Sequence, residues 1–192
     1  QTSYKNNAAQ ATGANQPNYI ANGMNGLPVL RFNSTNSTFM TFDGAFLIGT
    51  NYTIFLVEQR RSATGGIISG TGGANQNLHI IYATGTIMRI SHYAADLDYS
   101  SIPNYSTPVP RMHSFTMSST LGKSYWLNGG TTADATAAQY GQLTAYPGSA
   151  LGRLGNASTY FNVDIAEVII FTRNLKTEER NSIETYLSKK WG

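Results

Sequence analysis

The feature that most constrains this chain is a succession of short, strand-like runs separated by turn residues. Residues 52–60 carry apolar side chains on both faces, as in a strand covered on both sides, and residues 113–119 alternate apolar and polar side chains. Turn-forming pairs such as Asn25-Gly26 and Asn128-Gly129 recur between the runs. The pattern predicts an all-β fold, a two-sheet antiparallel β-sandwich of the jelly-roll type.

The C-terminal residues predict the one α-helix of the chain. Ile183, Leu187 and Trp191 recur every four residues and would form a buried apolar stripe. A length of 192 residues suits a single sandwich domain. We therefore expect one domain in three parts: an irregular N-terminal segment over 1–26, a β-sandwich over 27–176 and a short packed helix over 177–192.

Composition narrows the range of functions. Charged residues are only 12% of the chain, against about 25% in average soluble domains. The net charge of +3 is small and the basic residues are scattered, so nucleic acid is not an expected partner. No apolar run approaches the ~18 residues of a membrane span, so membrane insertion is not expected. The absence of cysteine excludes disulfide scaffolds and thiolate metal sites.

Three segments carry a family resemblance. They are residues 16–32 (QPNYIANGMNGLPVLRF), 124–129 (SYWLNG) and 161–192, which opens FNVDIAEVIIFTRNLKTEER and closes YLSKKWG. Together they resemble the laminin-G-like jelly-roll branch of the concanavalin A-like lectin/glucanase superfamily. This branch occurs in bacterial secreted and surface proteins and in phage structural proteins, which implies an extracellular, cell-surface or virion location. Similar sequences usually have a β segment before the stretch matched by Ala11-Thr12, so we expect a longer polypeptide upstream of Gln1.

The sequence lacks the carboxylate pattern that the superfamily's glycanases use. These enzymes carry an E-x-D-x-E type motif on one strand, and glycoside hydrolysis needs two carboxyl groups ~5–10 Å apart. The nearest pair here is Asp164 and Glu167, whose spacing of three predicts opposite faces of a strand. The histidines also lack metal-type spacing, and packed imidazoles are expected. We therefore expect no enzymatic activity.

Two loop-rich regions combine tyrosine with Asn and Asp, a combination suited to sugars. Aromatic rings stack on the C–H faces of sugars, and polar side chains bond their hydroxyls. The candidate ligand-binding residues are Tyr93, Asp96, Asp98, Tyr99, Asn104, Tyr105, Asn156 and Tyr160. The competing interpretation is that these tyrosines cover the core with their hydroxyls in water.

Calcium is the one cofactor that the resemblance suggests, since many laminin-G-like and legume-lectin-like domains hold it at one rim. Asp96 and Asp98 are the candidate ligands. Calcium takes six to eight oxygens, so two solvated loop carboxylates are the simpler interpretation. The fold itself requires no cofactor.

Three functional hypotheses follow. The leading one is a non-catalytic carbohydrate-binding or adhesion module of a larger extracellular or virion protein, with a glycan or cell-surface polysaccharide as partner. The second is a structural decoration or fibre module that packs against copies of itself or against other virion or surface proteins. A glycoside hydrolase comes third, because the carboxylate pair is missing.

Overall fold

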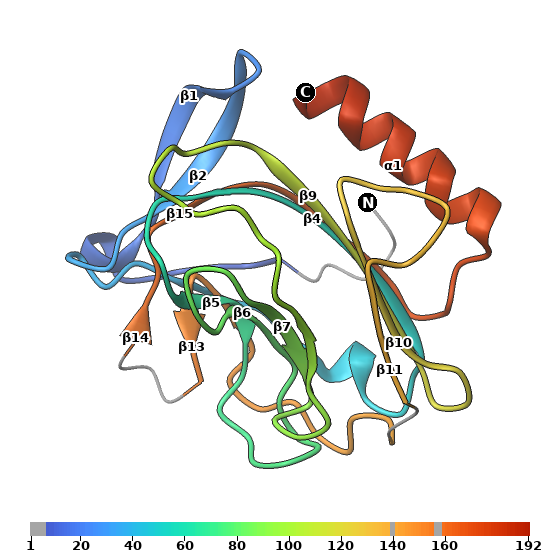
Figure 1. The fold of residues 1–192 in the computed structure, drawn as a ribbon. Coiled ribbons are helices and arrows are strands. Elements are labelled where there is room, and N and C mark those ends of the chain that lie inside the picture. The colour runs from blue at the N-terminus through green and yellow to red at the C-terminus, as the bar shows by residue number, and fades with distance from the viewer. Residues whose placement is uncertain (1–6, 139–140, 156–158) are drawn as a thin grey trace.

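The computed structural model describes residues 7–138, 141–155 and 159–192, and two antiparallel sheets form a sandwich (Figure 1). The seven-stranded sheet has the order β1 (Asn18–Met24), β2 (Leu27–Phe32), β15 (Val163–Phe171), β4 (Tyr52–Arg60), β9 (Arg111–Ser118), β10 (Gly122–Leu127) and β11 (Ala135–Ala137). The six-stranded sheet has the order β3 (Met40–Thr41), β12 (Ala150–Leu151), β5 (Gly65–Ser69), β6 (His79–Tyr82), β7 (Met88–Ser91) and β8 (Leu97–Tyr99). The predicted β-sandwich is confirmed.

Smaller elements complete the architecture. They are a two-stranded pair of β13 (Arg153–Leu154) and β14 (Thr159–Tyr160), the 3-10 turns η1 (Gly13–Asn15) and η2 (Ala45–Leu47), and the helix α1 (Thr177–Trp191). The helix occupies the predicted residues and lies over the outer face of the larger sheet, against β4 and β9 (Figure 1). Among the described residues, no helix is long and apolar enough to cross a membrane.

Both faces of strand β4 are apolar because both are covered by other parts of the chain. Ile54 and Leu56 point into the core between the sheets. Phe55 and Val57 alternate with them and pack in a second cluster under α1, with Leu187 and Trp191. All four strand residues are at most 2% exposed, and each buried side chain of this size contributes about 1.5–3 kcal/mol.

The N-terminal segment differs from the prediction. Residues 1–26 were expected to be irregular, but Asn18–Met24 forms β1 and pairs with β2. Asn25 and Gly26 join the two strands, with φ of 46° and 73°, which is the backbone that tight hairpins need. The prediction was wrong because β1 is an edge strand in which only Met24 is buried, so it carries no alternating apolar pattern.

Candidate functional site

The outer face of the six-stranded sheet carries a polar cluster at β6, β7 and β8. Side chains alternate along these strands, and Ile80, Met88, Ile90 and Leu97 belong to the core. Their neighbours His79, Arg89 and Asp98 therefore face outward. The strand register sets Arg89 opposite Asp98 and His79 opposite Ser91, which brings the polar side chains of three strands onto one surface.

Arg89 is the centre of this cluster. Its Nε and Nη2 donate to the two carboxylate oxygens of Asp98, each at 2.7 Å, and its Nη1 lies 2.8 Å from Oδ2 of Asp96. The hydrogen bond with Asp98 raises the pKa of the Arg89 guanidinium. All three side chains are about one-third exposed, so the ion pairs contribute little stability but fix three polar groups at the surface.

Tyr93 stands beside this ion-pair cluster as an exposed aromatic ring on a strained backbone. Its φ is +60°, a conformation that costs a bulky residue about 1–3 kcal/mol, and the residue is 59% exposed. The ring meets His79 edge to face, with centroids 5.1 Å apart. Burial lowers the pKa of His79, and its Nε2 has no hydrogen-bond partner among the described residues. The buried imidazole of His79 therefore packs against the exposed ring and helps to hold it in place.

The turn that carries Tyr93 is held from inside the sandwich. The Lys123 ammonium donates to the Ala95 carbonyl at 2.5 Å, and the backbone N–H of Asn75 donates to the His92 carbonyl at 2.8 Å. Burial lowers the pKa of Lys123 to about 8, and Asp96 opposes that shift. Ala95 also has a positive φ, of 50°, so the turn is tight on both sides of its tip. These contacts keep the strained conformation in place.

The structure brings together only part of the first predicted group. Tyr93, Asp96 and Asp98 meet at this surface. Tyr99 alternates with Asp98 and faces inward, where its ring lies 5.2 Å from that of Tyr125. The inward position follows from the two-residue period of β8.

Asn104 and Tyr105 lie at the opposite end of the smaller sheet from Tyr93. The Tyr105 ring is 5.9 Å from the guanidinium of Arg60, which itself lies over the ring of Tyr82, the last residue of β6. Asn104 is exposed, and its side chain accepts the backbone N–H of Tyr105. The segment 93–111 thus runs along the sandwich and does not gather at one rim.

The second predicted group is also divided. Asn156 lies outside the described residues. Tyr160, on β14, packs its ring 6.0 Å from that of Phe39, and Arg153 lies over the same Phe39 ring. Gly155 follows β13 and borders the cluster, since a Cβ there would lie 3.8 Å from Nε2 of His79.

Sequence reasoning missed His79 and Arg89. One available signal was that Arg89 alternates with the apolar residues Met88 and Ile90, which marks it as an outward position on a strand. The contact of Arg89 with both aspartates depends on the pairing of β7 with β8. No such pairing was predicted for the segment after residue 92.

The predicted calcium ligands do not fit a metal site as they stand. Asp96 and Asp98 are both bound by Arg89, so the guanidinium holds the place that a cation would take. The described residues contain no group of three or more His, Cys, Asp or Glu side chains placed to hold a metal ion. Calcium would have to displace Arg89 and recruit further oxygens.

The carboxylates of β15 correct a second expectation. Asp164 and Glu167 were predicted to lie on opposite faces, but they pair with Gln59 and Val57, two residues apart on β4, and therefore share one face. A β-bulge between Ile165 and Glu167 inserts the extra residue that shifts the alternation. Arg31 and Arg61 bind Asp164, and Lys190 binds Glu167, so each carboxylate has a cationic partner.

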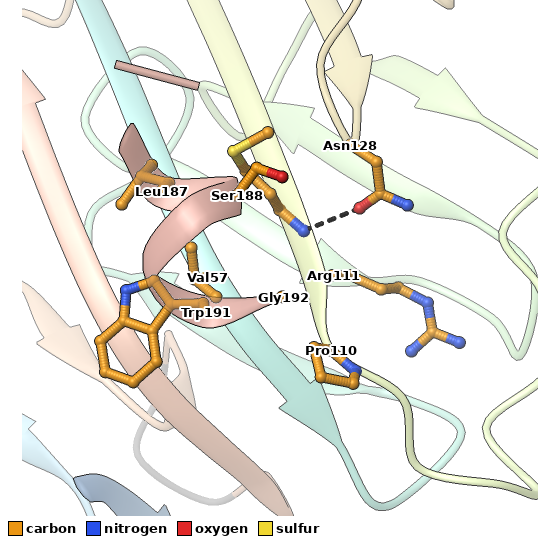
Figure 2. A pocket seen from close by; sticks show the side chains of 9 residues that line it. Val57, Pro110, Arg111, Asn128, Leu187, Ser188, Trp191 and Gly192 are labelled. Atoms are coloured by element: carbon orange, nitrogen blue, oxygen red, sulfur yellow. Dashed lines mark hydrogen bonds between the residues drawn. The ribbon is translucent and has the colours of Figure 1, made fainter. Parts of the chain in front are cut away.

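Two of the hollows formed by the described residues lie on the helix side of the larger sheet. One, of about 210 Å³, is walled by Val57, Leu187 and Trp191 and faces Asn128 (Figure 2). The backbone N–H of Met112 donates to Asn128 Oδ1 at 3.0 Å, the bond drawn in Figure 2. Trp191 is only 5% exposed, so this hollow belongs to the packing of the helix. The other hollow is polar and includes Arg31 and Arg61.

Comparison with known proteins identifies the fold. No protein-family model and no curated protein sequence matches the chain. Solved structures do match. The binding domain of botulinum neurotoxin serotype G has a TM-score of 0.69 at 12% identity, over 97% of this chain and 48% of that one. Domain 4 of AbnA, a GH43 extracellular arabinanase from Geobacillus stearothermophilus, in complex with arabinotriose, has a TM-score of 0.64 at 12% identity, over 88% and 81%.

A third match is Trypanosoma rangeli sialidase in complex with sialic acid, with a TM-score of 0.61 at 15% identity, over 83% of this chain and 28% of that one. The fold is a β-sandwich that this chain shares with these domains. The chain spans about half the length of the neurotoxin domain and under a third of the sialidase. At these identities the likeness establishes the fold and leaves the ligand to be argued from the site.

Proposed function

We propose that this chain is a non-catalytic carbohydrate-binding module that binds glycan at the outer face of its six-stranded sheet. The observation that carries the proposal is the Tyr93 ring, 59% exposed, held in a strained backbone conformation and braced by buried His79. An exposed aromatic side chain kept in a costly conformation, which the surrounding contacts enforce, points to a functional role.

The chemistry of the cluster suits a sugar ring. A sugar has an apolar C–H face, which packs on an aromatic ring, and a rim of hydroxyl groups. The carboxylates of Asp96 and Asp98 accept hydrogen bonds from such hydroxyls. Because Arg89 already fixes both carboxylates, little side-chain entropy is lost on binding.

The structural neighbours support a glycan as the ligand class. The arabinanase domain is described in complex with arabinotriose, and for a further structural neighbour, botulinum neurotoxin type C, cell entry is described as dependent upon interaction with two ganglioside molecules. The arabinanase is extracellular by its description, and we extend that setting to this chain, as part of a larger secreted, surface or virion protein. The paired state of Asp164 and Glu167 supports a role without catalysis.

A glycan array tests the proposal directly. The full chain is expected to bind a subset of glycans, and Tyr93→Asn is expected to lose that binding while it stays folded. The absence of binding to any glycan, together with an unchanged melting temperature at saturating oligosaccharide, would overturn the proposal.

A second candidate function is packing against copies of the same chain or against other surface or virion proteins. It is favoured by the edge strand β1, whose Tyr19 is 68% exposed and whose outer backbone edge pairs with no strand of the described residues. Light scattering of the purified chain distinguishes the two functions. A stable oligomer that the substitution Tyr19→Asn dissociates would favour packing.

A further inference from the structure

The polar hollow on the helix side of the larger sheet contains an ion cluster with one cation in excess. Asp164, on β15, is fully buried, and Arg31 binds it with two hydrogen bonds, of 2.7 Å from Nε and 2.8 Å from Nη2. Arg61 adds one longer contact, of 3.4 Å from Nη1. Arg31 alone satisfies the carboxylate in the bidentate geometry, so the second guanidinium is not needed for charge balance.

The surplus charge is not neutralised within the hollow. Its described lining consists of Arg31, Phe32, Asn33, Thr35, Arg61 and Asn162, which includes no acidic side chain. Two guanidinium groups therefore face the single carboxylate of Asp164. Both arginine side chains remain about one-third exposed, and the charge left over is accessible from solvent.

The hollow contains several hydrogen-bond donors that are not used within the described residues. Arg61 uses only Nη1, so its Nε–Nη2 edge has no partner among the described residues. That edge is the planar fork that binds carboxylates in two parallel hydrogen bonds. The hollow thus contains a guanidinium edge to which the carboxylate of a ligand can bind.

Two amide side chains of the hollow also leave their donor groups unused. Asn162 Oδ1 accepts the backbone N–H and the hydroxyl of Ser34, at 2.8 and 3.1 Å, and Asn33 Oδ1 accepts the backbone N–H of Thr35 at 2.8 Å. Since the amide oxygens are engaged, the NH2 groups are left as donors, and neither has a partner among the described residues. The amide oxygens are occupied and the amide NH2 groups are available as donors, an arrangement that suits an anion.

We infer that this hollow is a second binding site, which takes the carboxylate of an acidic sugar such as a uronic or sialic acid. The carboxylate lies on the Arg61 fork, and the amide groups of Asn33 and Asn162 bond the adjoining hydroxyls. A volume of about 270 Å³ suits one sugar residue, being below the ~300–1,000 Å³ of pockets for drug-sized ligands. The site faces the helix side of the sandwich and does not include Tyr93; that its ligand is a sugar rests on the proposed function.

Calorimetric titration with matched acidic and neutral oligosaccharides tests this inference. The probes are trigalacturonic acid and sialyllactose, each against its neutral counterpart. The wild-type chain is expected to bind at least one acidic probe tenfold or more tightly than its counterpart. Arg61→Gln is expected to weaken that binding at least tenfold and to reduce its dependence on salt.

A control and a second variant keep the test specific. Arg173→Gln removes an equal charge from an exposed arginine that pairs with Glu179, and it should leave binding unchanged. Asn162→Asp keeps an oxygen for Ser34 but replaces the donor, so it should also weaken binding of the acidic probe. Because Arg61 is more than one-third exposed, its variant is expected to fold, which its melting temperature verifies.

Three outcomes would overturn the inference. The first is equal affinity for the acidic and neutral probes, and the second is an equal effect of the Arg61 and Arg173 variants on binding. The third is displacement of the acidic probe by inorganic sulfate or phosphate at equal concentration, because the hollow would then be a general anion site. Loss of neutral-glycan binding in Tyr93→Asn with acidic binding retained supports two sites. Acidic binding that Tyr93→Asn leaves unchanged, in a chain that binds no neutral glycan, would overturn the proposed Tyr93 site and leave this one standing.

Discussion

Replacing Tyr93 by asparagine should separate binding from stability. Asparagine tolerates the left-handed backbone at this position, so the substitution relieves about 1–3 kcal/mol of strain. It also removes the edge-to-face contact with His79, which contributes about 0.5–1.5 kcal/mol. The two effects nearly cancel. The free energy of unfolding should change by about 1 kcal/mol or less, which corresponds to a melting-temperature shift of about 2–4 °C for a domain of this size.

The same substitution should cost much more in binding. Truncation of an anchoring aromatic side chain at the centre of a binding site typically costs about 2 kcal/mol or more. Since about 1.4 kcal/mol is tenfold in affinity, the dissociation constant for the glycan should rise at least about thirtyfold. Tyr93→Phe keeps the ring and should stay near the wild-type affinity. Tyr19→Asn removes another exposed tyrosine, on β1, and should have no effect on glycan binding.

Calorimetry and thermal unfolding, measured on the same preparations, provide the assay. Wild-type affinity in Tyr93→Asn would refute the stacking role. A fall in melting temperature well beyond 4 °C would show instead that the ring is part of the fold, because the strain estimate would then be wrong.

Three further predictions concern stability. Gly65→Ala should destabilise the chain by at least about 2 kcal/mol, because the new Cβ would lie 2.2 Å from the fully buried ring of Phe161. In the control variant Gly73→Ala the new Cβ has no atom within 4 Å, so the melting temperature should stay unchanged or rise slightly. Calcium or a chelator should not shift the melting temperature, because Arg89 binds both candidate carboxylates; a rise of several degrees with calcium would contradict this. Burial lowers the pKa of His92 to about 4, so the unfolded chain takes up a proton near pH 6.5 that the folded chain refuses. Stability should fall by about 3 kcal/mol between pH 6.5 and 4, and denaturant titrations of His92→Gln should show a smaller fall if this histidine is the cause.

Strands with a buried face could be predicted from the sequence, and exposed edge strands could not. Residues 52–60 form β4 as expected, since burial on both faces leaves an unbroken apolar run. Strand β1 has no such run because most of its residues are exposed, and Asn25-Gly26 signalled a turn without showing what it joins. The bulge in β15 was equally hidden, because an inserted residue leaves no compositional trace.

The candidate site was predictable only where its residues are adjacent in sequence. Asp96 and Asp98 could be grouped with Tyr93 from composition alone. Their partner Arg89 lies on the preceding strand, and its role follows from the β7–β8 register. The alternation along β8 also turns Tyr99, next to Asp98, inward against the core, so polar and aromatic residues that are close in sequence do not all belong to the site.

The buried network at the centre of the sandwich bears on the proposal of a role without catalysis. Glu58 accepts hydrogen bonds from the Tyr82 hydroxyl at 2.6 Å and from Nε2 of His113 at 3.0 Å, and His113 Nδ1 bonds the Tyr125 hydroxyl at 2.9 Å. A carboxylate, an imidazole and two phenols would suit acid–base chemistry in an open cleft. Here Glu58 and His113 are fully buried, because Tyr82 projects from the opposite sheet and fills the space above them.

Exposing this network would require the two sheets to separate. The same inner face carries Ile54, Leu56 and Phe115, each fully buried, and every such side chain moved into water costs about 1.5–3 kcal/mol. Three of them already approach the 5–15 kcal/mol that separates folded from unfolded domains. A substrate could not reach Glu58 without partly unfolding the core. The burial of Glu58 and His113 is thus consistent with our proposals that ligands bind on the outer faces of the sheets, at Tyr93 on one side and at Arg61 on the other.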